Sequence, residues 1–314
     1  MKYRKGSETV QKEGFGCMGG RMKRLLISAG MAALLFFSMI PYSVQAEDAA
    51  AALPIDLSGG MPLNQAFFTG DLTYEDRTIS VTIEQGRYEE ECDYWIADIK
   101  IAHPSQLRTA AADGFDSDMV MDGCRLAKRV NAVLAIDGDY FSYTGEGYIM
   151  RQGKLYLNVL SGKRDVLLID EDGDFHIVEA PVKGDVKRTV DGKKVINAFY
   201  FGPALVIDGS VNLRMAQNDD MASAEKRQRM CIAQVGPLEY KCICCGPPAR
   251  GSTGMSLMQF ARFVAAQGVQ TAYNLDGGDS CMLIFNGKKI NDVKNTYVRE
   301  INDIIYFASA YGAN

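Results

Sequence analysis

Two short acidic turns contain the side chains best suited to chemistry. The first, residues 137–139, reads Asp-Gly-Asp, and the second, residues 276–280, reads Asp-Gly-Gly-Asp-Ser. Each turn follows directly on an apolar run, so its carboxylates are expected at the end of a strand, where α/β proteins place their ligands. The glycines let the backbone approach a ligand closely. We therefore interpret both turns as parts of one ligand site.

Other interpretations of these turns stay open. An aspartate that starts an Asp-Gly pair after a strand is often only a turn former. The acids could also hold a hard cation such as Ca²⁺ through oxygen ligands, but no loop has the ligand spacing of an EF-hand. We therefore predict no metal site and no required cofactor. The acids concerned are Asp137, Asp139, Asp276 and Asp279.

Each acidic turn is preceded by a helix and a strand. Residues 256–268 predict a helix, because a Ser/Gln capping box starts it, an apolar face recurs at helical spacing and a glycine ends it. A strand at 272–275 then leads into the second turn. A helix at 121–130 and a strand at 133–136 repeat this design ahead of the first turn.

The rest of the chain is typical of short strands joined by Asp-Gly and Asn-Gly turns. Apolar or alternating runs predict these strands at 79–83, 94–102, 166–169, 175–178, 204–207, 230–235, 282–285 and 304–307. Neither an internal repeat nor an interior linker interrupts the pattern. We predict an α/β (mixed α+β) fold, a single domain with a large twisted mixed sheet and few helices.

Composition excludes several classes of protein. Of the 314 residues, 47% are hydrophobic and 23% charged, as in folded globular proteins. The formal charge of −5 argues against a nucleic-acid partner, which would require a basic face. Only His103 and His176 are present, which excludes a His-rich metal site and restricts any Ser-His-Asp triad to one of them.

The first 46 residues are interpreted as a signal peptide. Two basic residues precede an uncharged apolar run at 25–40, and a small-residue cleavage site ends at Ala46, with Met22 as an alternative start. The alternative is an uncleaved membrane anchor through residues 25–40, which would be the protein's one contact with a membrane. Residues 47–74 are then predicted to be a tether. The expected location is secreted or at the cell surface.

Seven cysteines follow the predicted cleavage site, an odd number, so at least one is expected to stay free or to pair between chains. Three of them lie in residues 242–245, whose spacing resembles half of a zinc site. No second pair or histidine lies nearby to complete four ligands. Buried thiols in a core strand are the preferred interpretation.

Several segments together resemble the phosphodiester glycosidase family. They follow one another in the family's order and are residues 135–141 (AIDGDYF), 148–156 (YIMRQGKLY), 201–206 (FGPALV), 229–233 (RMCIA), 254–257 (GMSL), 272–280 (AYNLDGGDS) and 299–306 (REINDIIY). Any one of these motifs is weak, but the set in register identifies residues 75–310 as a phosphodiester glycosidase-like domain.

The resemblance implies a bacterial exported hydrolase that cleaves the glycosidic bond of a sugar-1-phosphodiester in a surface or extracellular glycan. Such chemistry requires a carboxylate at the oxocarbenium-like centre and donors for the phosphate. The matching catalytic residues are Asp276 and Asp137. The matching substrate- and phosphate-binding residues are Arg151, Arg229, Asp139, Gly277, Gly278, Asp279 and Ser280.

The sequence also departs from the family pattern. Asp137 and Asp279 replace an asparagine and a glycine, and residues 245–247 (Cys-Gly-Pro) stand where the family has an Asp-Gly-Arg turn. These changes make the site more anionic, which disfavours a phosphodiester. Three interpretations follow: an active hydrolase with an altered substrate, a catalytically degenerate glycan-binding protein, or a structural protein of the cell surface.

Overall fold

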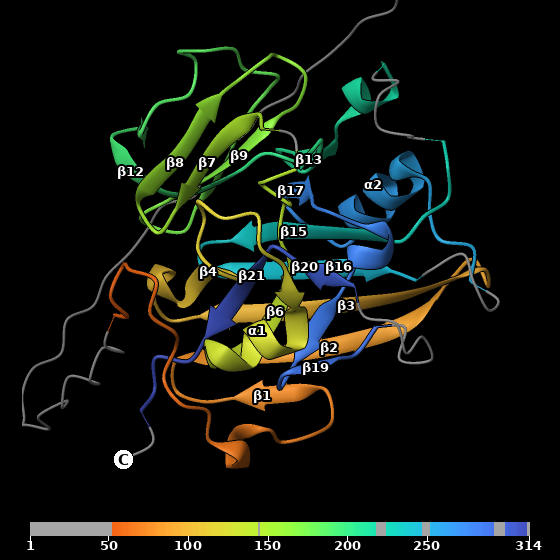
Figure 1. Cartoon of the computed structure of the whole chain (residues 1–314). Helices are drawn as coiled ribbons and strands as arrows, with labels where there is room; N and C mark the ends of the chain where they lie inside the picture. The colour runs from red at the N-terminus through yellow and green to blue at the C-terminus, as the bar shows by residue number, and fades with distance from the viewer. Residues whose placement is uncertain (1–51, 144, 218–223, 247–251, 292–298, 313–314) are drawn as a thin grey trace, which may run out of the picture. The chain divides into compact units, whose positions relative to one another are not determined.

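The computed structural model describes residues 52–143, 145–217, 224–246, 252–291 and 299–312 (Figure 1). These residues fall within one compact unit, Asp48–Asn314. The predicted signal peptide or anchor lies outside the described residues. Within them, none of the helices has the length and apolar character needed to cross a membrane.

The largest sheet has eight strands in the order β1-β2-β3-β16-β15-β17-β13-β14. Their bounds are β1 Thr73–Glu75, β2 Ile79–Tyr88, β3 Cys92–Ile101, β13 Ala204–Ile207, β14 Ser210–Val211, β15 Arg229–Gly236, β16 Glu239–Cys245 and β17 Thr271–Asn274. Helix α2 (Leu257–Ala265) packs on one face of this sheet, through an apolar cluster that it shares with β13 and β15.

A five-stranded sheet has the order β19-β18-β6-β21-β4. The end of β6 and the start of β21 contribute residues to the functional site. Its strands are β4 Leu107–Ala111, β6 Ala132–Asp137, β18 Leu283–Phe285, β19 Lys288–Lys289 and β21 Asp303–Ala308. Helix α1 (Gly123–Arg129) packs against its outer face, beside β6 and β21 (Figure 1).

Two further sheets complete the architecture. A six-stranded sheet has the order β10-β9-β12-β7-β8, with β11 paired to β12, and a two-stranded ribbon joins β20 to β5. Their bounds are β5 Met121–Asp122, β7 Gly147–Arg151, β8 Lys154–Val159, β9 Val166–Asp170, β10 Phe175–Val178, β11 Thr189–Val190, β12 Lys193–Phe199 and β20 Glu300–Ile301.

The main core lies between the eight-stranded and the five-stranded sheets. Alternation along β2 explains how a strand reaches it: Ile79, Val81 and Ile83 are buried there, and the residues between them are more exposed. On β15 the alternation serves two layers, since Ile232 faces this core and Cys231 faces α2. The resulting order of layers is α2, large sheet, five-stranded sheet, α1.

The predicted fold class is confirmed in its coarse form, since strands predominate and α-helices are few. The prediction of one large mixed sheet is wrong. The strands divide among several sheets, and every pairing among the described strands is antiparallel. The physical reason is that the two α-helices of the described residues are too few to cover both faces of one large open sheet, whereas two sheets packed face to face bury each other's apolar faces.

The prediction of a tether at 47–74 is also corrected for its described part, residues 52–74. The buried Arg108 guanidinium donates hydrogen bonds to the carbonyls of Pro54, Asp56 and Ser58, at 2.9, 3.1 and 2.9 Å. Phe67 and Phe68 pack on the main core. This segment is therefore part of the domain, because a buried arginine without these acceptors would be strongly destabilising.

Local sequence signals predicted the turns and one helix well. Ser256 and Gln259 form the expected capping box of α2. The turns Asp191-Gly192, Asp208-Gly209 and Asn286-Gly287 close three hairpins, and each places both residues at positive φ, as a type I′ turn requires. These turns set the register of the β11–β12, β13–β14 and β18–β19 hairpins.

Candidate functional site

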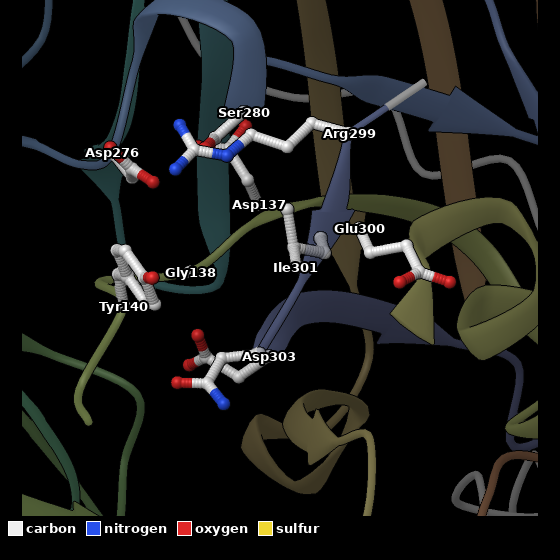
Figure 2. A pocket seen from close by; sticks show the side chains of 10 residues that line it. Asp137, Gly138, Tyr140, Asp276, Ser280, Arg299, Glu300, Ile301 and Asp303 are labelled. Atoms are coloured by element: carbon white, nitrogen blue, oxygen red, sulfur yellow. The ribbon is translucent and has the colours of Figure 1, made fainter. Parts of the chain in front are cut away.

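A pocket of about 240 Å³ lies where the chain leaves β6 and β17 and enters β21 (Figure 2). Its lining comes from three segments that are far apart in sequence. The lining residues are Asp137, Gly138, Tyr140, Asp276, Ser280, Arg299, Glu300, Ile301, Asn302 and Asp303. The two acidic turns predicted from the sequence therefore meet, as expected, and a third segment joins them.

Asp137 is the most deeply buried acid of the pocket, with 1% of its surface exposed. Its Oδ1 accepts a hydrogen bond from the backbone N–H of Met282 at 2.9 Å, and its Oδ2 has no hydrogen-bond partner among the described residues. Burial raises the pKa of Asp137 well above its usual value, and the nearby Asp276 carboxylate raises it further. Asp137 therefore keeps its proton to higher pH than an ordinary aspartate, and in the protonated form it can donate a hydrogen bond or a proton.

Asp276 is the more accessible of the two acids. Burial raises its pKa above the usual value, but the hydroxyl of Ser280, the N–H of Gly277 and the positive charge of Arg299 oppose that shift. The Gly277 N–H donates to Asp276 Oδ1 at 2.9 Å. Asp276 thus ionises more readily than Asp137, and the two carboxyl groups are suited to different roles.

Arg299 is the cation of the pocket. Among the described residues that line it, no other side chain is positively charged. Figure 2 shows its guanidinium group beside Ser280 and directed toward Asp276. The guanidinium also lies 5.9 Å from the ring centroid of Tyr140. A planar guanidinium next to a serine hydroxyl can bind one oxygen pair of a phosphate.

The backbone around Asp303 fixes the first acidic turn. A Cβ atom at Gly138 would lie 2.3 Å from the Asp303 carboxylate, so only glycine fits there. Tyr140 has a φ of 51°, which is rare for a bulky residue, and its N–H donates to Asp303. Gly138 thus lines the pocket and also lies closely against a buried acid.

Behind the pocket, Arg151 joins two acids in a buried cluster. Its Nη2 lies 2.6 Å from Asp139 Oδ1 and 3.5 Å from Asp303 Oδ2, and all three side chains are almost fully buried. The guanidinium also stacks 4.2 Å from the Phe199 ring centroid. Arg151 does not line the pocket, so the structure does not place it where the phosphate clamp implied by the resemblance would lie.

Replacing Arg151 by glutamine should lower the free energy of unfolding by about 3–5 kcal/mol, because Asp139 and Asp303 would remain buried without a cation. Denaturant unfolding measures this loss. The matched control is Lys100→Gln, whose exposed ion pair with Glu239 should contribute less than about 1 kcal/mol. Equal losses in the two variants would show that the buried cluster is not a structural unit.

Asp303 makes stability depend on pH. Burial and the Asp139 carboxylate raise its pKa to about 7, against the attraction of Arg151. The folded protein then holds a proton that the unfolded chain releases near pH 4, so this contribution is full below about pH 4 and is lost as the pH rises through about 7. The melting temperature of wild type minus that of Asp303→Asn should fall over this interval. A constant or rising difference would contradict the assignment.

Arg229, the second predicted clamp, does not line the pocket. It begins β15 and its guanidinium donates to the carbonyls of Met255 and Glu225, at 3.2 and 2.9 Å. Cys245, the last residue of β16, lies directly opposite Arg229 in the pairing of β15 with β16. It is fully buried in the apolar cluster beneath α2. The departure from the family pattern at Cys245 therefore removes no group from the pocket, while Pro247 lies outside the described residues.

The remaining predicted residues belong to the turn that follows β17. Gly277 and Gly278 form the turn itself, and the Gly278 N–H donates to the carbonyl of Gln228 at 3.1 Å. A Cβ at Gly277 would lie 2.7 Å from that same carbonyl. Asp279 is exposed and is not among the residues lining the pocket. These residues shape the turn, and Asp276 and Ser280 are its members that reach the pocket.

A family model described as phosphodiester glycosidase matches residues 130–308. This match covers more than half of the chain and includes all the segments that line the pocket. The chain belongs to the phosphodiester glycosidase family. The resemblance noted in the sequence motifs is thereby confirmed. None of the curated proteins matches the sequence.

Solved structures support the same fold for this phosphodiester glycosidase family member. The catalytic domain of zebrafish N-acetylglucosamine-1-phosphodiester alpha-N-acetylglucosaminidase, auto-inhibited by its pro-peptide, has a TM-score of 0.57 at 16% identity, over 80% of this chain and 87% of that chain. A hypothetical protein from Synechocystis has a TM-score of 0.50 at 13% identity, over 76% of this chain and 64% of that chain.

The donor groups of this family member do not form a metal centre in the described part of the chain. No group of three or more His, Cys, Asp or Glu side chains there could hold an ion. All seven described cysteines are free thiols, six of them buried, and three of these lie in β16. The side chains that line the pocket include four carboxyl groups, one guanidinium, the hydroxyls of Tyr140 and Ser280 and the amide of Asn302.

Proposed function

We propose that this protein hydrolyses the glycosidic bond of a sugar-1-phosphodiester. Water adds to the anomeric carbon, the bond from that carbon to the phosphate oxygen breaks, and a phosphate monoester leaves with the electron pair. The observation that carries the proposal is the meeting of Asp137, Asp276 and Arg299 in one pocket, within a domain of the phosphodiester glycosidase family.

Asp276 acts at the sugar. Its ionised carboxylate stabilises the positive charge that develops on the anomeric carbon, which has oxocarbenium character in glycoside hydrolysis. Arg299 and the hydroxyl of Ser280 bind the phosphate oxygens. The charge on these oxygens grows as the bond breaks, so both contacts strengthen toward the transition state.

Asp137 supplies a proton-bearing group. Its burial and the unpartnered Oδ2 support a protonated carboxyl that donates to an oxygen of the substrate. A phosphate monoester is a good leaving group. Proton donation by Asp137 therefore assists this reaction less than it would assist the hydrolysis of a glycoside whose leaving group is an alcohol. Asp303 and Arg151 hold the turn that contains Asp137, and Arg151 does not line the pocket.

The proposal extends to location and target. The apolar run at 25–40 and the small-residue cleavage site favour an exported protein that is secreted or held at the cell surface. Its substrate would then be a glycan in the envelope or outside the cell, in which a sugar is linked through a phosphodiester. N-terminal sequencing of exported material should begin near Glu47, and retention of residues 25–40 would indicate an anchor.

The activity is tested by incubating the purified full chain with a panel of glycosyl phosphodiesters, including methyl N-acetylglucosamine-1-phosphate, and following release of free sugar. We expect turnover of at least one diester and none of the corresponding simple methyl glycosides, which lack the phosphate that Arg299 binds. A protein that binds oligosaccharides but hydrolyses no diester would be a glycan-binding module instead.

A further inference from the structure

Four buried cysteines form two pairs that the proposed function does not use. The thiols of Cys92 and Cys245 hydrogen-bond to each other, and so do those of Cys244 and Cys281. Each of the four residues is at most 1% exposed. The cysteine-rich segment at 242–245 therefore does more than fill the core, because two of its members each face another thiol.

The first pair joins the start of β3 to the end of β16. Cys245 lies opposite Tyr94 in the pairing of these strands, so Cys92, two residues before Tyr94, faces the same side of the sheet. Both cysteines belong to the apolar cluster beneath α2. The N–H of Gly246 donates to the carbonyl of Asp93 at 2.6 Å, next to both cysteines. The backbone of the sheet thus holds the two sulfur atoms beside each other.

The second pair joins β16 to the turn at 276–281. Cys244 precedes the β16 member of the first pair, so its side chain faces the other side of the sheet, toward the main core, where Cys281 also lies. Cys281 directly follows Ser280, which lines the pocket. It directly precedes Met282, whose N–H donates to the Asp137 carboxylate. A bond between these two cysteines would therefore connect β16 to the segment that positions both pocket residues.

We propose that each pair forms a disulfide when the protein meets a disulfide oxidant, Cys92–Cys245 connecting β3 to β16 and Cys244–Cys281 connecting β16 to the turn at 276–281. Each step breaks two S–H bonds of the protein and the S–S bond of the oxidant, and it forms one S–S bond in the protein. The oxidant, a small or a protein disulfide, accepts two electrons and two protons and leaves as two thiols. The inference does not depend on the proposed hydrolysis.

Burial determines when these bonds form and how long they last. The sulfur atoms are shielded from an oxidant once the domain has folded, so the exchange takes place as the chain folds. The same burial then protects the finished bonds from reduction by external thiols.

Three of the seven described cysteines remain outside the two pairs. Cys231 lies in the cluster beneath α2, Cys242 lies in the main core, and Cys124 packs on the cluster around α1. We expect all three to stay thiols. Two disulfides and three thiols agree with the odd number of cysteines, which requires at least one to remain without a partner in the chain.

The test is disulfide mapping of the full-length protein. The reduced, unfolded chain is refolded with a mixture of reduced and oxidised glutathione, the remaining thiols are alkylated, and the tryptic peptides are analysed by mass spectrometry without reduction. Because Cys244 and Cys245 lie on one peptide, we expect a single assembly of the peptides 88–100, 242–250 and 263–288. If the chain does not refold, protein isolated from an oxidising compartment of the expression host is mapped in the same way.

Two variants assign the bonds. Cys245→Ala should release peptide 88–100 and keep peptide 263–288 linked, and Cys244→Ala should do the reverse. The matched control is Cys231→Ala, which removes another fully buried cysteine and should preserve both links. Fragmentation of the wild-type assembly assigns the same bonds if a variant fails to fold. Complete alkylation of the seven cysteines beyond residue 46, or links through Cys231 or Cys242, would overturn the proposal.

Thermal unfolding provides the second readout. Disulfides stabilise a protein chiefly by restricting its unfolded chain, so the melting temperature of oxidised wild type should exceed that of protein refolded without oxidant by about 5–15 °C. Cys244→Ala and Cys245→Ala should each lose roughly half of this difference, and Cys231→Ala should keep it. Each variant is compared with its own reduced form, so lost packing cancels. Equal melting temperatures for the two forms of wild type would show that the bonds do not hold these segments in place.

Discussion

Replacing Asp276 by asparagine should lower kcat/KM for a glycosyl phosphodiester on the order of 10²-fold or more. The substitution preserves size and removes the negative charge that stabilises the developing positive charge at the anomeric carbon. Steady-state kinetics measure the loss, and it should appear mainly in kcat because the contact strengthens in the transition state.

The control for Asp276 is Asp208→Asn. Asp208 also precedes a glycine directly after a strand, in the exposed turn between β13 and β14, and it does not line the pocket. Its replacement should leave kcat/KM within about twofold of wild type, as expected for a surface turn. Wild-type kinetics in Asp276→Asn would reduce Asp276 to a turn former, the alternative that the sequence left open.

Replacing Arg299 by glutamine should lower kcat/KM roughly tenfold to a hundredfold, because a charge-assisted hydrogen bond to phosphate contributes about 1.5–3 kcal/mol. Arg299→Lys should lose less, since it keeps the charge but not the planar pair of donors. The matched control is Arg125→Gln, an exposed arginine of α1 that does not line the pocket.

The same variant should shift the pH dependence of kcat/KM. Activity requires ionised Asp276, so it falls as the pH drops through the pKa of that group. Arg299 lowers this pKa, and removing its charge should therefore move the acid limb of the profile to higher pH. An acid limb that stays in place or moves to lower pH would show that Arg299 and Asp276 do not share a site.

The sequence predicted the two acidic turns of the site because each depends on local signals. The two apolar runs end directly before Asp137 and Asp276, and a glycine follows each of these two acids. Such patterns predict strand ends, since a continuous apolar run stops where charge and glycine begin. Asp137 and Asp276 meet although β6 and β17 belong to different sheets, because these two sheets pack face to face around the main core.

The sequence did not predict the third segment of the pocket. From the sequence, residues 299–306 are only one of the segments that resemble the family, and neither Arg299 nor Asp303 is predicted as a site residue. Their position depends on β21 lying between β6 and β4, a pairing of strands more than 160 residues apart in sequence. The signal that could have found them is the pair of charges immediately before an apolar strand within a family motif.

Two arginines were predicted to bind the phosphate, and neither of them lines the pocket. Arg151 and Arg229 occupy family motif positions, but the direction of a side chain from a strand depends on register and on the neighbouring layer. Arg151 faces inward to Asp139 and Asp303, and Arg229 is held by backbone carbonyls. Motif position located both strands correctly and did not determine which side chains reach the ligand.

The central claim is that the enzyme cleaves the bond between the anomeric carbon and oxygen, and this is tested most directly by hydrolysis in ¹⁸O-labelled water. The phosphate monoester released from methyl N-acetylglucosamine-1-phosphate, or from whichever diester in the panel is hydrolysed, is analysed by mass spectrometry. We predict an unlabelled phosphate product, because water attacks carbon and the phosphate keeps its own four oxygens. A phosphate product containing ¹⁸O would show attack at phosphorus and would contradict the assignment of Asp276 and Asp137 to a glycosidase.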